Sequence, residues 1–296
     1  MKKIIPHIWF ETQARDAASW YTGIFKDSRI LFETSLAGTP SGTVQVISLQ
    51  LMGQEFQFLN AGPLFDRNPS FSYMIACSTA AEVDHLWKKL IVGGQALMPL
   101  DTYPFSERFG WVLDQYGLSW QIMHDGGRKV QALTPALLFT QKAAGHAEES
   151  MQDLIKLVGD GEVLPGHLQR HPAGGPDREG TLQYARFRLG QQEFVFMDSA
   201  IGHAFTFNEM QSLMIYVESQ AEIERYSNAL SRVPEAEQCG WVKDAYGISW
   251  QIVPTRMDEM MAKGSPEEIQ RLVQAFLPMK RMNIAALEKA FAGRER

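Results

Sequence analysis

The amino-acid sequence predicts an α+β fold in which βαβββ modules follow one another in tandem and the chain ends in a helical tail. A long internal repeat is the main observation behind this prediction. Residues 111–123 (WVLDQYGLSWQIM) and 241–253 (WVKDAYGISWQIV) are identical at nine of thirteen positions and lie 130 residues apart. Residues 51–60 correspond in the same order to residues 189–198. Self-similarity at a fixed period indicates two copies of one structural unit.

The repeat also sets the expected domains. A chain of 296 residues has a usual length for two domains. We expect the first domain at residues 1–125 and the second at 130–255, with residues 126–133 as a short connector. Residues 256–296 form the predicted helical tail.

The first module begins at residues 4–10, which are apolar with β-branched members and predict a strand. Residues 14–25 carry apolar side chains at helical spacing and predict a helix. Residues 43–51 alternate between apolar and polar side chains, and residues 54–59 follow after Gly53. These two segments predict a hairpin.

The second module restarts the same order. Thr79 and Glu82 have the spacing of a capping box and predict the start of a helix. Gly93 and Gly94 predict its end. The strands of this module are expected at residues 70–77, 109–114 and 118–123.

The second copy carries matching signals. Residues 147–158 take the place of the first helix, and Ser219 with Glu222 forms another capping box. Residues 165–180 are rich in proline and glycine, which predicts a mobile loop between strands.

The tail has helix signals of its own. Ser265 is a cap residue, Pro266 stands at the first helical position, and Asn283 caps a shorter helix. Apolar side chains recur at helical spacing and predict a buried stripe, formed by Ile269, Leu272, Val273 and Phe276. The second domain or a partner subunit in a homodimer is expected to cover this stripe.

The composition excludes several classes of partner. A formal charge of −6 and an isoelectric point near 5.7 argue against binding to nucleic acid or to an anionic membrane surface. No apolar run reaches the roughly 18 residues that span a bilayer. Cys77 and Cys239 stand at non-equivalent places in the two copies, so we expect no disulfide framework and a cytoplasmic location.

Several motifs together resemble a known family. They are PHIWF at 6–10, LNAGPLF at 59–65, LMPL at 97–100, MDS at 197–199 and HAFTFN at 203–208. These segments resemble the PhnB-like branch of the vicinal oxygen chelate superfamily, whose domains are described as 3-demethylubiquinone-9 3-methyltransferase. The superfamily includes glyoxalase I, extradiol dioxygenases and bleomycin-resistance proteins. The resemblance implies two glyoxalase-like domains with curved mixed sheets.

The resemblance also implies where a metal would bind. Metal-dependent members place four ligands on the inner face of the curved sheet, and the matching positions in the first copy are His7, Gln57, Tyr73 and Gln121. In the second copy the matching positions are Ala136, Val195, Leu213 and Gln251. Only His7 is a strong ligand, whereas divalent metals need several imidazole, carboxylate or thiolate donors. We therefore expect no metal.

The word methyltransferase in the family description raises the question of a Rossmann-type cofactor site. Such a site needs a glycine-rich turn between a strand and the helix that follows it. The nearest candidate, Gly159 and Gly161, follows a predicted helix instead. We therefore expect no cofactor.

A small-molecule pocket is the remaining interpretation. Strand parity places His7 and Trp9 on one face of the first strand and Gln57 on the matching face of another, with Tyr73 facing them. Trp9, Gln57, Tyr73 and Gln121 are the predicted ligand-binding residues. Apolar walls with a few polar groups suit a small organic ligand.

Two of these residues have an alternative interpretation. His7 is the candidate catalytic residue, as a general base that titrates near neutral pH, but it also fits a hydrogen-bonded wall residue. Gln121 recurs as Gln251 in the second copy, and this recurrence favours a structural role such as bridging strands.

The sequence thus predicts a metal-free, PhnB-like protein that binds a small molecule, with catalysis left open. A metal-dependent lyase or dioxygenase that keeps His7 as a ligand is the first alternative. A scaffold or dimerisation protein with a vestigial pocket is the second. The ligand is expected in the cleft of the first copy, because the matching positions of the second copy are apolar.

Overall fold

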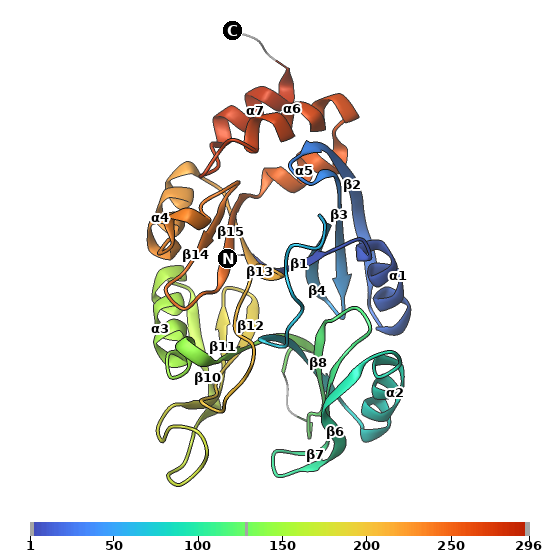
Figure 1. The fold of residues 1–296 in the computed structure, drawn as a ribbon, viewed down its shortest axis with the longest axis vertical. Coiled ribbons are helices and arrows are strands. Elements are labelled where there is room, and N and C mark those ends of the chain that lie inside the picture. The colour runs from blue at the N-terminus through green and yellow to red at the C-terminus, as the bar shows by residue number, and fades with distance from the viewer. Residues whose placement is uncertain (1–2, 128–129, 294–296) are drawn as a thin grey trace.

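The structure of the protein is a computed structural model that describes residues 3–127 and 130–293. The strands form two mixed sheets, and helices cover their flanks (Figure 1). In the first repeat the elements are β1 (Ile4–Phe10), α1 (Ala14–Ile24), β2 (Arg29–Thr39), β3 (Gly42–Leu51), β4 (Gln54–Asn60), β5 (Phe71–Cys77), α2 (Ala80–Leu90), β6 (Gln95–Tyr103), β7 (Ser106–Leu113) and β8 (Ser119–His124).

The second repeat follows the same order of elements except in its last module, and the helical tail comes after it. The repeat contains β9 (Leu133–Phe139), α3 (Ala147–Val158), β10 (Gly161–Arg170), β11 (Leu182–Leu189), β12 (Gln192–Asp198), β13 (Gln211–Val217), α4 (Gln220–Leu230), β14 (Trp241–Lys243) and β15 (Ser249–Pro254). The tail contains α5 (Arg256–Lys263), α6 (Pro266–Phe276) and α7 (Ile284–Ala292). In the last module a 3₁₀ turn at Pro234–Ala236 and the short β14 replace the long hairpin that β6 and β7 form.

Each sheet combines strands of both repeats. The seven-stranded sheet has the order β14-β15-β13-β1-β4-β3-β2, and the eight-stranded sheet has the order β10-β11-β12-β9-β5-β8-β7-β6. The strands β1 and β13 join the repeats in the first sheet, where they run antiparallel and pair His7 with Ser212. The strands β5 and β9 join them in the second, where Ser72 pairs with Ala136. The expected α+β class with mixed sheets is confirmed.

The helix-covered faces, by contrast, divide by repeat. One apolar cluster gathers almost entirely first-repeat side chains around Tyr21, Phe58, Tyr73 and Trp120. A second cluster gathers the second repeat and the tail around Trp250, together with first-repeat side chains such as Leu36 and Val44 of the β2–β3 hairpin. The first repeat therefore has a core of its own under its helices, while the second cluster is shared by both repeats and the tail.

Most of the predicted elements are confirmed, but three features differ. The strands β2 and β6 were not expected, because neither shows a clean alternation. Residues 165–170 are strand rather than loop, since β10 continues to Arg170 and pairs Leu168 with Ala185 across a register shift. Of the predicted connector, residues 128–129 lie outside the described residues.

The most similar segment of the two repeats builds one structural clamp. The Asp114 carboxylate accepts hydrogen bonds from the backbone N–H groups of Tyr116 and Leu118 and from Trp120 Nε1. The Asp244 carboxylate accepts the equivalent bonds from Tyr246, Ile248 and Trp250. The repeated motif therefore ties the turn before β8 and before β15 to a buried tryptophan, and its recurrence has a structural cause.

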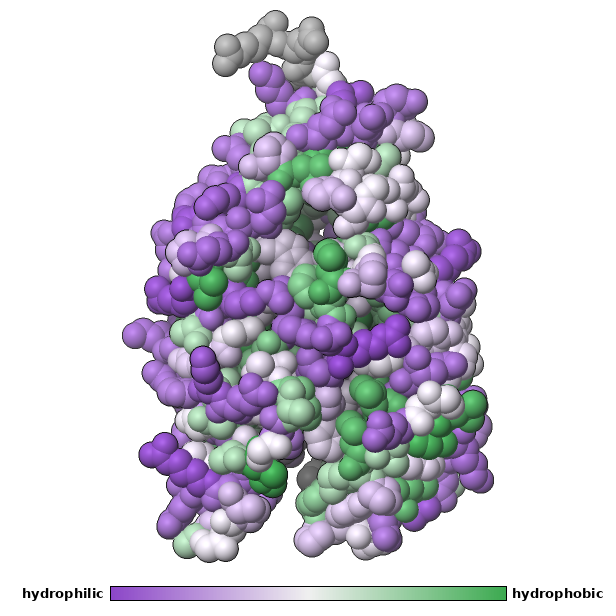
Figure 2. Space-filling model, in the orientation of Figure 1, coloured by the Kyte–Doolittle hydropathy of each residue, from purple (hydrophilic) through white to green (hydrophobic). Residues whose placement is uncertain are grey.

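The tail joins the two repeats at one end of the molecule (Figure 1). On the face shown in Figure 2, hydrophobic residues gather below this tail. The predicted stripe is buried, and α6 packs on β2 of the first repeat as well as on α7. On the other side, Cys239 N–H donates to the Met279 carbonyl at 2.7 Å and Gly240 N–H donates to the Lys280 carbonyl at 2.9 Å. The stripe on α6 is thus covered within the chain by β2 of the first repeat and by α7, rather than by the second domain as expected, and the segment after α6 is tied to the second repeat. No helix within residues 3–127 and 130–293 is long and apolar enough to cross a membrane.

Candidate functional site

A cavity of about 430 Å³ lies against the concave face of the seven-stranded sheet. Its floor comes from β1 and β4 of the first repeat and from β13 and β15 of the second. The β2–β3 hairpin forms one wall. Side chains of the tail close the cavity from above, namely Met257, Met261, Phe276, Leu277 and Met282. The cavity therefore belongs to neither repeat alone, which corrects the expectation of a cleft inside the first copy.

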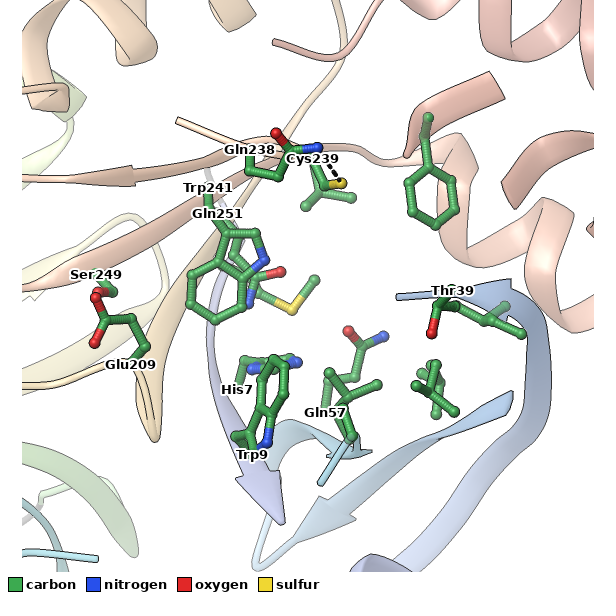
Figure 3. Close-up of a pocket in the computed structure, with 18 of the residues that line it drawn as sticks. His7, Trp9, Thr39, Gln57, Glu209, Gln238, Cys239, Trp241, Ser249 and Gln251 are labelled. Atoms are coloured by element: carbon green, nitrogen blue, oxygen red, sulfur yellow. Dashed lines mark hydrogen bonds between the residues drawn. The ribbon is translucent and has the colours of Figure 1, made fainter. Parts of the chain in front are cut away.

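A row of polar side chains crosses the cavity floor. The register places His7 beside Gln57 on β4 and beside Ser212 on β13. The amide Nε2 of Gln251 donates to the Ser212 hydroxyl at 3.0 Å, and this hydroxyl lies 3.4 Å from His7 Nδ1. His7, Gln57 and Trp241 reach the same space from different strands (Figure 3).

His7 is a neutral group in this environment. The side chain is 3% exposed, and burial lowers its pKa from 6.5 to about 3. Its ring stands perpendicular to the ring of Trp241, with the centroids 5.5 Å apart. An imidazole with so low a pKa is uncharged at neutral pH and is a weak base there.

Two polar atoms at the cavity are buried without a hydrogen-bond partner. They are Gln57 Nε2 and the Ser249 hydroxyl. In the other sheet the serine that matches Ser249 is Ser119, which accepts a bond from Trp111 Nε1 at 2.6 Å. Buried polar groups are rarely left unpaired, since each one costs about 1–3 kcal/mol. Both residues line the cavity, so a small side-chain rotation would let a bound molecule complete their hydrogen bonding.

The walls of the cavity are apolar and aromatic. The Trp9 ring is held by a 2.8 Å hydrogen bond from Nε1 to the Gly62 carbonyl, and it lies 5.1 Å from the ring of Phe65. Glu209 is the one charged side chain among the described residues that line the cavity, and it forms an ion pair with Lys243. The cavity thus offers hydrophobic contact and neutral hydrogen-bonding groups.

Tyr73 lies elsewhere, and the reason is a shift of one residue in strand parity. Its hydroxyl donates to Gln211 Oε1 at 2.7 Å, and its ring packs on Phe56 and Trp120 under the helices. The residue of β5 on the concave face is Ser72. Because successive side chains of a strand point to opposite faces, a shift by one position moves Tyr73 to the other side. The same shift replaces Leu213 by Ser212.

Gln121 also lies outside this cavity, on the eight-stranded sheet. Its Nε2 donates to the Ser72 hydroxyl at 2.8 Å, which repeats the bond between Gln251 and Ser212. On that sheet the positions that match His7 and Gln57 hold Ala136 and Val195, which form a small apolar cluster with Met74. Of the predicted residues the structure brings together His7, Trp9 and Gln57 at the cavity.

Sequence reasoning missed several residues of the site. Ser249 lies two positions before Gln251 on β15, so strand alternation places both side chains on the same face. This spacing in the repeated SWQ motif could have identified Ser249. Trp241 opens the same repeated block. The contribution of the tail had no signal beyond its apolar stripe, since such a stripe predicts burial but does not name what it covers.

The donor set at the cavity floor does not fit a divalent metal. The floor strands present one imidazole, two carboxamides and one hydroxyl group to the cavity, whereas structural and catalytic sites use several anionic or imidazole ligands. Of the other lining residues, Glu209 is paired with Lys243, and burial raises the pKa of the Cys239 thiol. Within the described residues, no three His, Cys, Asp or Glu side chains gather closely enough to hold an ion.

The family is decided by two matches along the chain. The model of the 3-demethylubiquinone-9 3-methyltransferase family matches residues 2–123 and again residues 131–253. The chain belongs to this family. It is a PhnB-like member of the vicinal oxygen chelate superfamily, with two tandem copies of the family domain.

Solved structures show where this PhnB-like chain stands among relatives. The PhnB protein of Bacillus cereus is 34% identical over 41% of this chain and 98% of its own, with a TM-score of 0.39. Glyoxalase I from Zea mays covers 88% of this chain and 96% of its own with a TM-score of 0.55, at 11% identity. The second likeness shows the glyoxalase fold alone. No curated protein is similar enough to count as a relative.

Proposed function

We propose that this PhnB-like chain is a metal-free protein that binds a small organic molecule in the cavity of the seven-stranded sheet. One observation carries the proposal. A mostly apolar cavity of about 430 Å³ is lined by two residues that each bury a polar atom without a partner, Gln57 Nε2 and the Ser249 hydroxyl. Ligand sites commonly have this volume and this combination of apolar walls and a few polar groups. A catalytic role for His7, a homodimer and a cytoplasmic location stay predictions.

Filling the cavity tests the proposal. Leu59 lines it on β4 beside Trp9, and Met197 occupies the matching position on β12 beside Leu138. The variant Leu59→Trp should abolish the rise in melting temperature that library compounds give the wild-type protein, because the larger ring takes the ligand's place. The matched variant Met197→Trp should keep those rises. Thermal denaturation against a library of small organic molecules measures both.

The opposite pattern would place the ligand on the eight-stranded sheet. Hits that survive Leu59→Trp and disappear in Met197→Trp contradict the proposed site. A library without any hit on the wild-type protein would favour the scaffold alternative instead.

The donor set makes a prediction about metals. Protein incubated with Zn²⁺, Ni²⁺, Mn²⁺ or Fe²⁺ and then desalted should retain well below one equivalent, because one imidazole with neutral amides holds these ions weakly. Elemental analysis of the desalted protein measures this. Stoichiometric retention that is lost in His7→Ala would support the metal-dependent alternative.

A further inference from the structure

The cavity has no group that would compensate a charged ligand. No lysine or arginine is among the described residues that line it, and its single carboxylate, Glu209, is paired with Lys243. His7 is buried and uncharged at neutral pH because burial lowers its pKa. Moving a carboxylate or an ammonium group from water into such a space costs several kcal/mol without a partner. The walls therefore select against ions of either sign.

The two buried polar atoms of the floor that lack a partner can both donate a hydrogen bond to a ligand. Gln57 is 5% exposed, and its amide Nε2, which carries two N–H groups, has no acceptor. The Ser249 hydroxyl is also free, because Trp241 lies against His7 instead of bonding this serine as Trp111 bonds Ser119. A ligand oxygen that accepts a hydrogen bond would satisfy the buried amide.

The aromatic walls complete the chemical description. Trp9 is held in place by its bond to Gly62 and by Phe65, and Trp241 is held against His7. Rigid aromatic side chains favour contact with flat apolar ligands, since little side-chain freedom is lost on binding.

We propose that the cavity takes an uncharged, mostly apolar ring compound whose carbonyl oxygen accepts a hydrogen bond from the Gln57 amide. This inference rests on the proposed function and narrows it to one ligand class. It assigns Gln57 the role of specificity determinant, and it assigns the apolar and aromatic walls the role of excluding charged compounds.

Three probes of nearly equal shape test the ligand class. They are 2-acetylnaphthalene, 2-isopropenylnaphthalene, which lacks the acceptor oxygen, and 2-naphthoate, which is ionised at pH 8. Titration calorimetry with the full chain should show the ketone binding about 10-fold more tightly than the alkene, as one buried hydrogen bond predicts. The carboxylate should bind at least about 100-fold more weakly than the ketone.

Two variants connect the preference to its residue. Gln57→Leu removes the donor without breaking a protein hydrogen bond of Nε2, so the fold should be retained and the ketone should lose its advantage over the alkene. Gln57→Met is a second variant with the same expectation. Gln121→Leu is the control, because it removes a buried amide from the eight-stranded sheet, away from the cavity. In this variant the ketone should still bind more tightly than the alkene.

The outcomes separate this inference from the proposed function. Naphthoate that binds as tightly as the ketone, or a ketone preference that survives both Gln57 variants, overturns the ligand class alone. Library hits that Leu59→Trp abolishes, with none of the three probes binding, also overturn the class and leave the proposed function standing. If neither the library nor the probes bind, both are wrong.

Discussion

Replacing Asp114 with alanine should lower the melting temperature by roughly 6 °C or more, which corresponds to about 3 kcal/mol of unfolding free energy. The carboxylate accepts from the Tyr21 hydroxyl at 2.6 Å and from Trp120 Nε1 at 2.7 Å, and also from two backbone N–H groups. Each buried donor left without an acceptor costs about 1–3 kcal/mol. Burial raises the pKa of Asp114, so relief of its desolvation offsets part of this loss. Thermal or urea denaturation measures the effect.

The second repeat supplies a matched control. Asp244 accepts from Trp250 Nε1 and from backbone N–H groups, but its clamp has no counterpart of the Tyr21 hydroxyl. Asp244→Ala should therefore lower the unfolding free energy less than Asp114→Ala does. Adding Tyr21→Phe to Asp114→Ala should recover most of the difference, because it removes the hydroxyl that Asp114→Ala leaves without an acceptor. Equal losses in the two aspartate variants, or no loss in either, would contradict the clamp as the reason for the repeat.

Local pattern predicted the elements well because each depends on neighbours in sequence. The caps at Thr79, Ser219 and Ser265 follow from side chains within a few residues of each helix start. Sheet order depends instead on which strands meet across the whole chain. The strand β1 is buried on both faces, so nothing in its sequence distinguishes β13 from β5 as its neighbour.

The candidate site was predictable only where a strand showed a clear alternation. Alternation on one strand placed His7 and Trp9 together, and Gln57 followed from the adjacent β4. The placement of Tyr73 opposite His7 was wrong because the inward-facing positions of β5 are shifted by one residue from those predicted. This strand is buried on both faces, so its sequence shows no alternation that would fix them. Its partner across the fold, Gln211, lies 138 residues away, and no local pattern records such a contact.

The tail should be needed to keep the cavity closed. Leu272 on α6 is fully buried in the cluster that includes Leu36 and Val44 of the β2–β3 hairpin. Leu272→Asp places an unpaired carboxylate there and removes apolar burial worth about 1.5–3 kcal/mol. We expect α6 to separate from the hairpin and not from the second repeat. The segment after α6 stays bound to the second repeat through the backbone hydrogen bonds at Cys239 and Gly240, which the substitution does not touch.

Three measurements follow from this separation. The melting temperature of Leu272→Asp should fall by roughly 6 °C or more, trypsin should cleave the tail faster than in the wild-type protein, and compounds bound in the cavity should lose affinity because Phe276 no longer covers them. Gln274→Asp is the matched control, because it adds the same charge to the exposed face of the same helix. If both variants melt and bind like the wild-type protein, α6 does not hold the cavity closed. If Leu272→Asp melts lower but binds as before, the tail stabilises the chain without serving the ligand, and the cavity remains enclosed by the two repeats alone.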